Sequence, residues 1–161
     1  MFIPSCRVLA RTAGSLLVAA FLTVPASEAL AATFTVNENG SATDLTGGTG
    51  ACATTNGGCS FHAAIQSVNA QGPGPHTIAF SIAKVTLAAN LPTILVPVTI
   101  DGGGSRTEIV GGPGPGPGAF GSIILGSTSG TSTVKNLVIG YMSGAGISIV
   151  DGGKTVQNCR I

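Results

Sequence analysis

Apolar and polar residues repeat in the C-terminal part of the chain with a spacing of 22 residues. The hexapeptide Val134-Lys-Asn-Leu-Val-Ile139 returns as Val156-Gln-Asn-Cys-Arg-Ile161, with apolar residues at positions one, four and six. Asn stands at position three, where the alternation of a strand is interrupted. A repeat of this length predicts stacked coils, in which each copy forms a short strand, a sharp turn at Asn and a second strand.

The two asparagines of the repeat are expected to occupy equivalent turns. Asn tolerates the left-handed backbone region, and its side-chain amide can bond to a neighbouring segment of chain. Stacked coils would therefore bring the side chains of Asn136 and Asn158 together in an amide ladder.

An earlier copy of the hexapeptide is followed by an insertion. Leu95-Val-Pro-Val-Thr-Ile100 keeps the apolar positions and has Pro97 where the other copies have Asn. Its Ile100 lies 39 residues before Ile139, so this coil is longer than the next. The Gly- and Pro-rich tract at residues 111–118 accounts for the extra length and predicts an extended, solvated loop.

The alternation also predicts which residues face the interior. Leu137 and Ile139 are expected to point inward and Val138 outward, because adjacent strand residues face opposite sides. Gly146-Ile-Ser-Ile149 alternates again and predicts a further strand. We therefore expect an all-β parallel β-helix whose core stack comprises Leu95, Val98, Ile100, Val134, Leu137, Ile139, Ile147, Ile149, Val156, Cys159 and Ile161.

A single amphipathic helix is predicted ahead of the coils, at residues 60–70. Ser60 can cap its start, and Gly72 follows it as a stop signal. The first coil of a β-helix exposes an apolar cross-section and unpaired strand edges, so a helix placed there has a use as a cap. Its apolar stripe consists of Phe61, Ala64, Ile65 and Val68.

Composition favours strands and turns and argues against nucleic acid as a partner. Only 8% of the residues are charged, and 25 of the 161 are Gly. Without residues 1–31, five basic and five acidic residues remain, together with one Tyr and no Trp. A neutral surface with so few aromatic residues lacks the basic, stacking character of a nucleic-acid interface.

The N-terminus predicts an export signal. Arg7 and Arg11 precede an apolar stretch at residues 13–26, and Ala29-Leu-Ala31 supplies a small-residue cleavage site. The alternative is a retained membrane anchor, but the apolar stretch is shorter than the roughly 20 residues that span a bilayer. We expect cleavage after Ala31, a mature chain without a transmembrane span, and a secreted or cell-surface location.

Export would place the cysteines in an oxidising compartment. Cys52 and Cys59 flank the flexible sequence Ala-Thr-Thr-Asn-Gly-Gly and are predicted to form a local disulfide. A metal site would need further ligands at close spacing, and His62 alone is near in sequence. Cys159, at an inward position of the repeat, is expected to be a buried thiol. His62 is expected to be a half-exposed helix residue and His76 a loop residue.

The region around the predicted helix resembles a known family. Cys59-Ser-Phe-His-Ala-Ala-Ile65 is similar to the CSLREAI motif, which names an N-terminal domain of bacterial secreted right-handed parallel β-helix proteins. Positions 61–63 differ from the motif, so an ion pair that the family makes there would be absent. His76-Thr-Ile-Ala-Phe-Ser-Ile82 and Pro97-Val-Thr-Ile-Asp-Gly102 extend the likeness, which covers residues 34–161. The resemblance implies a right-handed β-helix with a structural cap, and it brings no catalytic residues.

Three regions follow from these observations. Residues 1–31 are predicted to be the signal peptide, residues 32–90 the cap with its disulfide loop and helix, and residues 91–161 the first coils of the β-helix. The chain stops on a strand of the repeat, at Ile161. We therefore expect it to be a fragment that packs against its own missing C-terminal coils.

Two classes of function fit this fold. The first is a non-catalytic secreted or cell-surface scaffold for adhesion or glycan binding, with an extracellular glycan or a cell surface as partner and with no metal or cofactor. The alternative is the N-terminal part of a polysaccharide lyase or glycoside hydrolase, whose active site would lie mostly in missing coils. Either chemistry needs clustered carboxylates. Those of the mature chain are dispersed in sequence, at Glu38, Asp44, Asp101, Glu108 and Asp151.

Overall fold

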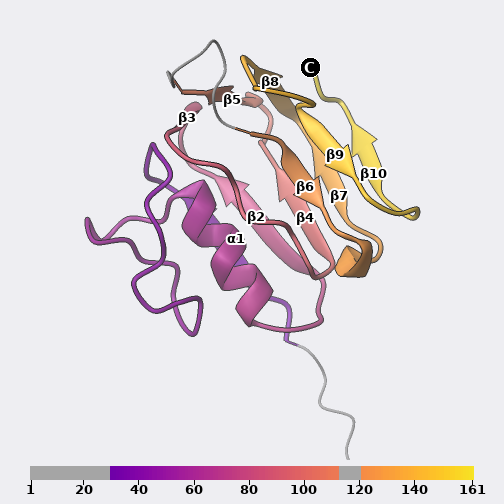
Figure 1. The fold of residues 1–161 in the computed structure, drawn as a ribbon. Coiled ribbons are helices and arrows are strands. Elements are labelled where there is room, and N and C mark those ends of the chain that lie inside the picture. Colours follow the sequence, from indigo (N-terminus) through magenta and orange to yellow (C-terminus); the bar gives the residue numbers. More distant parts are fainter. Residues whose placement is uncertain (1–29, 113–120) are drawn as a thin grey trace, which may run out of the picture.

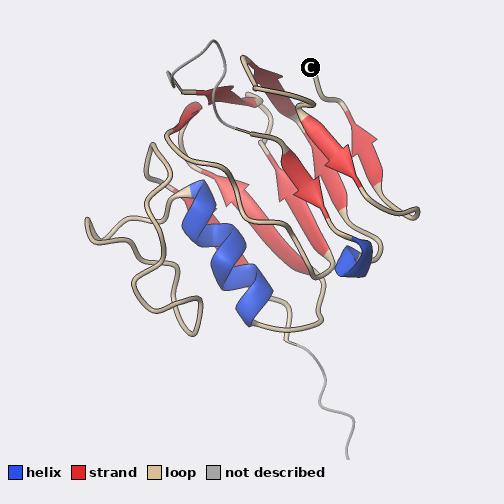
Figure 2. Cartoon of the chain, viewed as in Figure 1, coloured by secondary structure: helices blue, strands red, loops and turns tan. Residues whose placement is uncertain are grey.

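The computed structural model describes residues 30–112 and 121–161. Residues 1–29 of the predicted signal peptide and most of the Gly- and Pro-rich tract lie outside these residues. Strands dominate the described chain, with one α-helix and one short 3-10 helix (Figures 1 and 2). The elements are β1 (Thr33–Val36), α1 (Phe61–Ala70), β2 (His76–Phe80), β3 (Lys84–Leu87), β4 (Val98–Asp101), β5 (Thr107–Gly111), β6 (Ile123–Leu125), η1 (Ser127–Ser129), β7 (Thr133–Lys135), β8 (Leu137–Gly140), β9 (Ile147–Ile149) and β10 (Thr155–Gln157).

The strands form three parallel sheets around one apolar core. Sheet A has the order β1-β2-β4-β7-β10, sheet B the order β3-β5-β8, and sheet C pairs β6 with β9. From β4 onward the chain passes through sheets A, B and C in turn and then returns to sheet A (Figure 1). Each return places a strand parallel to the strand laid down one circuit earlier. The prediction of a mainly β fold is confirmed at this level.

The 22-residue spacing corresponds to one circuit of the chain. Val134 of β7 pairs with Val156 of β10, and Ile78 of β2 pairs with Ile100 of β4 at the same sequence separation. The circuit from β4 to β7 is longer, because it includes residues 112–122 between β5 and β6. Strand pairing between β4 and β7 therefore continues in register across a circuit that is longer in sequence.

The predicted copy at residues 95–100 is shifted relative to its true partners. Ile100 pairs with Val134, whereas Ile139 pairs with Ile109 of β5. The turn position opposite Asn136 is held by Gly102 and not by Pro97, since the Gly102 N–H donates to the Lys135 carbonyl at 3.1 Å.

Leu95 is consequently a wrong member of the predicted core stack. Its neighbours Ile94 and Val96 are buried, so the alternation of the extended chain turns Leu95 outward, where it is 49% exposed. The hexapeptide at residues 95–100 matches the one at residues 134–139 in residue type, but the two do not pair in that register in the sheets.

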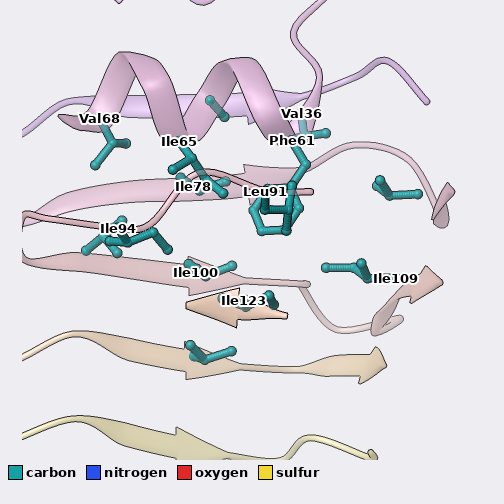
Figure 3. Packing of buried hydrophobic residues seen from close by; sticks show 14 of the residues in the cluster. Val36, Phe61, Ile65, Val68, Ile78, Leu91, Ile94, Ile100, Ile109 and Ile123 are labelled. Atoms are coloured by element: carbon teal, nitrogen blue, oxygen red, sulfur yellow. The ribbon is translucent and has the colours of Figure 1, made fainter. Parts of the chain in front are cut away.

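Helix α1 covers the end of the stack where sheet A begins. The Ser60 hydroxyl accepts a hydrogen bond from the Ala63 N–H at 3.0 Å and caps the first turn. Figure 3 shows Phe61, Ile65 and Val68 on the side of α1 that faces the strands. These three side chains and Ala64 are fully buried, and α1 contacts β1 and β2. The predicted cap stripe thus packs on the apolar core.

The opposite end of the stack leaves part of the predicted core uncovered. Val98, Ile100, Val134, Leu137 and Ile139 are buried, and Ile147 and Cys159 are half-buried against the same core. Strands β9 and β10 pair on one side only, so their inward residues have no described layer on the other. Three residues of the predicted core stack at this end, Ile149, Val156 and Ile161, are accordingly 47%, 40% and 70% exposed.

Candidate functional site

One corner of the stack carries the turns from sheet A to sheet B. Three residues, 81–83, connect β2 to β3, and five residues, 102–106, connect β4 to β5. Asn136 alone connects β7 to β8, and Asn158 follows β10 in the same way. Both asparagines have φ in the left-handed region, 56° and 53°, which allows the chain to turn within one residue.

The structure brings the two predicted ladder asparagines together. The Nδ2 of Asn158 donates to the Oδ1 of Asn136 at 2.5 Å, and the Nδ2 of Asn136 donates to the Oδ1 of Asp101 at 2.8 Å. The Arg106 guanidinium also donates to the Oδ1 of Asn158. Two residues that the sequence did not assign to the ladder, Asp101 and Arg106, therefore complete it.

Asp101 serves this corner as an ionised acceptor. Burial raises the pKa of its carboxyl, but hydrogen bonds from Asn136 and the Gly103 N–H, together with Lys135, outweigh burial and leave the pKa below the ordinary value. Its Oδ2 lies 3.1 Å from the Lys135 Nζ. Gly102 is required next to it, since a Cβ there would lie 1.9 Å from the Asn136 carbonyl oxygen. These contacts describe a structural turn residue rather than a proton donor for catalysis.

A groove of about 300 Å³ lies between the two longer corner loops. Phe80 lies at one side of it, and the edge of its ring packs against Phe61, with centroids 5.2 Å apart. The remaining lining carries hydroxyls, small apolar side chains and backbone, without a charged residue. The full lining is Phe80, Ser81, Ile82, Ala83, Gly102, Gly103, Gly104, Ser105 and Thr107.

The charged residues adjacent in sequence to the groove are paired with one another or with the ladder. Lys84 and Glu108, at the start of β3 and in β5, form an ion pair at 3.1 Å. Asp101 is paired with Lys135, and Arg106 with Asn158. Two of these contacts pair opposite charges, Arg106 is directed to the Asn158 amide, and the groove lining itself contains no charged residue, so the groove suits an uncharged, hydroxyl-rich ligand.

The other carboxylates hold the cap and its loops. Glu38 accepts from the Thr54 hydroxyl and from the Asn56 amide, the latter at 2.7 Å. Asp44 accepts from the Ser67 hydroxyl of α1 at 2.5 Å, and Asp151 accepts from the Gly152 N–H at 2.7 Å. Within residues 30–112 and 121–161, no three His, Cys, Asp or Glu side chains gather closely enough to bind a metal ion.

The predicted disulfide between Cys52 and Cys59 is confirmed, with an S–S distance of 2.02 Å. The Cys59 N–H donates to the Asn37 side chain at 2.7 Å, and the Asn37 N–H donates to the Cys59 carbonyl at 3.0 Å. The disulfide therefore closes a short loop within the segment between β1 and α1. Its role is structural.

The two histidines lie in different environments. His76 was predicted in a loop, but it begins β2 and is buried, with its Nδ1 accepting from the Ala32 N–H and its Nε2 donating to the Gly72 carbonyl. His62, on α1, is half-buried; burial lowers the pKa of its imidazole, and a hydrogen bond with Gln66 opposes the change. Neither geometry brings a histidine to a carboxylate or to the groove.

A second feature, which the sequence analysis missed, lies on the outer face of sheet A. Five threonines pair in continuous register, one on each strand, at positions 33, 77, 99, 133 and 155. We call this row the threonine ladder. Each of its members immediately precedes an inward apolar residue, so a Thr-apolar dipeptide recurring in every strand of one sheet was the available signal.

Comparisons with protein-family models, curated proteins and solved structures found no match to this chain. Among the residues that the structure describes, no helix has the length and apolar character needed to cross a bilayer. The corner groove and the outer face of sheet A are the two surfaces of the described chain that suit a ligand.

Proposed function

We propose that this chain is a secreted or cell-surface right-handed parallel β-helix scaffold of the CSLREAI type, which binds uncharged glycans without catalysis. The cyclic passage through three parallel sheets and the one-residue Asn turns support the β-helix. The right hand is supported by the strong preference of parallel crossover connections for that hand. The Cys52–Cys59 disulfide is consistent with an oxidising, extracellular compartment.

The uncharged groove at the corner between sheets A and B is the observation that carries the binding proposal. Ser81 and Ser105 line the groove together with Phe80, a combination of side-chain types that suits a sugar with hydroxyls at its edge and C–H groups on its face. The volume of about 300 Å³ is at the lower end of the range for ligand pockets, so one sugar unit of a longer chain is the expected occupant.

A non-catalytic role is supported by the use of the carboxylates. Glu38, Asp44 and Asp101 each accept hydrogen bonds that fix a loop or turn, and Glu108 is paired with Lys84. Hydrolysis needs two carboxylates across one bond, and lyase chemistry needs carboxylates that hold Ca²⁺ beside a base. The groove is lined by neither set.

The test is binding and turnover measured together on the full chain. We expect the chain to bind soluble uncharged oligosaccharides, to bind acidic polysaccharides more weakly, and to release no reducing or unsaturated ends with or without Ca²⁺. Gly104→Gln, which fills the groove, should lower oligosaccharide affinity about tenfold. Gly152→Gln is the matched control, since Cβ atoms at both positions would meet open space.

Two results would contradict the proposal. The first is a wild-type chain that binds none of the oligosaccharides or polysaccharides. The second is reproducible turnover that disappears in Asp101→Asn or Asp151→Asn, which would favour the lyase or hydrolase alternative.

A further inference from the structure

The threonine ladder forms a regular array on the outer face of sheet A. Neighbouring strands of a sheet lie about 4.7–4.9 Å apart, so five in-register strands carry the ladder over roughly 19 Å. Thr33 lies on β1, at one edge of the sheet, and Thr155 lies on β10, at the other. The three central members are half-buried by their neighbours in the row, and the two outer members are exposed.

The hydroxyls of the ladder are free for an external partner. Elsewhere in the described chain, threonine hydroxyls donate to protein acceptors at positions 46, 49, 54, 107 and 128. No member of the ladder donates to or accepts from another described side chain or backbone group through its hydroxyl. These hydroxyls can therefore hydrogen-bond to a ligand without breaking a described contact within the protein.

Strand propensity does not by itself explain five threonines in one row. Thr is favoured in strands because its branched side chain fits a pleated surface. The next outward row of the same five strands provides a comparison, because it faces the same side of the sheet. That row is mixed, with Thr35, Ala79, Asp101, Lys135 and Gln157.

We propose that the threonine ladder binds the flat surface of an insoluble, uncharged polysaccharide. This inference rests on the proposed glycan-binding function and assigns it a second contact surface. A branched side chain has few rotamers to lose, so the array is preorganised for a rigid, periodic partner. Each Thr presents a hydroxyl and a methyl, which match the hydroxyls and C–H groups of a sugar chain.

Charge and composition favour an uncharged polymer over an acidic one. The charges of the adjacent row, Asp101 and Lys135, are paired at 3.1 Å, so these two rows of sheet A contain no unpaired charge that would attract an ionic polymer. The ladder also contains no aromatic residue, so its contacts consist of hydrogen bonds and methyl packing spread over several strands.

The experiment is co-sedimentation of the full chain with microcrystalline cellulose and with chitin. The double variant Thr99→Val/Thr133→Val removes two central hydroxyls and keeps the branched shape. Thr86→Val is the control, since Thr86 is a half-buried strand residue of sheet B whose hydroxyl has no partner within residues 30–112 and 121–161. We expect the double variant to lose about tenfold in affinity, with the control within about twofold of the wild type. Circular dichroism and thermal unfolding verify that both variants are folded.

The experiments can disprove the role of the threonine ladder separately from the proposed glycan-binding function. If the double variant sediments like the wild type while Gly104→Gln loses soluble oligosaccharide, the ladder assignment is wrong and the proposed function stands. If the wild type binds no polysaccharide of either kind, both are wrong. If it binds none and instead shapes ice crystals in a manner that the double variant loses, the ladder faces ordered water, and the polysaccharide assignment is overturned.

Discussion

The two ends of the stack use the same strand positions with different results. Near α1, Val36 and Ile78 are fully buried, because the helix supplies a layer over β1 and β2. At the other end, Val156 occupies the same row as Val134, yet it is 40% exposed, whereas Val134 is fully buried. The repeat therefore sets the direction of a side chain, and the neighbouring layer sets its burial.

Truncating one isoleucine at each end of the stack should give the largest difference in the free energy of unfolding. Ile65 of α1 is fully buried, and Ile161 is 70% exposed. Ile65→Ala should lower the free energy of unfolding by about 2–5 kcal/mol, since it removes transfer energy and leaves a cavity. Ile161→Ala should change it by less than about 1 kcal/mol. Urea denaturation measures both, and equal losses would contradict the assigned layers.

Removal of the Cys52–Cys59 disulfide should cause the next largest loss in the free energy of unfolding. Replacing Cys52 and Cys59 by Ser releases the loop between β1 and α1 and should cost about 2–3 kcal/mol by the loop-closure estimate. Cys159→Ser changes a half-buried thiol at the open end and should cost less. Thermal unfolding of the oxidised wild type and of the two variants gives the comparison. A larger loss at Cys159 would show that the open end is better packed than described.

A sharper comparison uses the same residue in the same row. Val134→Ala should cost about 2 kcal/mol, from roughly 0.8 kcal/mol per buried methylene-sized group and a residual cavity. Val156→Ala should cost under about 1 kcal/mol, since its side chain is already partly hydrated. If Val134→Ala and Val156→Ala lower the denaturant midpoint by the same amount, a further layer covers β10 in solution.

The smallest effect concerns acid stability at the α1 end. Burial raises the pKa of Asp44, but hydrogen bonds from Ser67, Thr46 and the Ala53 N–H outweigh it and leave the pKa below the ordinary value of 3.8. The stabilisation from Asp44 is thus present above pH 3.8 and is lost as the pH falls through the lower folded-state pKa.

Asp44→Asn should therefore be less stable than the wild type near neutral pH and should show a shallower loss of stability below about pH 4. The matched change Asp151→Asn, at an exposed residue that accepts from the Gly152 N–H, should cost less stability near neutral pH than Asp44→Asn. Denaturant midpoints recorded across this pH range provide the measurement. Parallel profiles for wild type and Asp44→Asn would refute the role of Asp44.

Local patterns in the sequence predicted the elements that depend on few residues. The cap of α1 follows from Ser60 and an apolar stripe, and the turns at Asn136 and Asn158 follow from a residue type that tolerates positive φ. The Cys52–Cys59 disulfide follows from a short flexible loop. Each of these depends on interactions within a turn or two of chain, which the sequence records directly.

Features that depend on pairing between circuits were harder to predict. Leu95 was placed inward because an apolar hexapeptide matched by type, while strand pairing had fixed a different register. The threonine ladder and the groove exist only after strands far apart in sequence are aligned. The exposure of Val156 depends on a layer that no local pattern describes.

Amide hydrogen exchange on the full chain tests the central claim, that one continuous stack is closed at α1 and open at β10. We expect slow exchange in β2, which pairs on both sides and contacts α1, and in β4, which also pairs on both sides, and much faster exchange in β10, which pairs on one side. β7 should be intermediate. Uniform protection from β2 to β10, or faster exchange near α1 than at β10, would contradict this account.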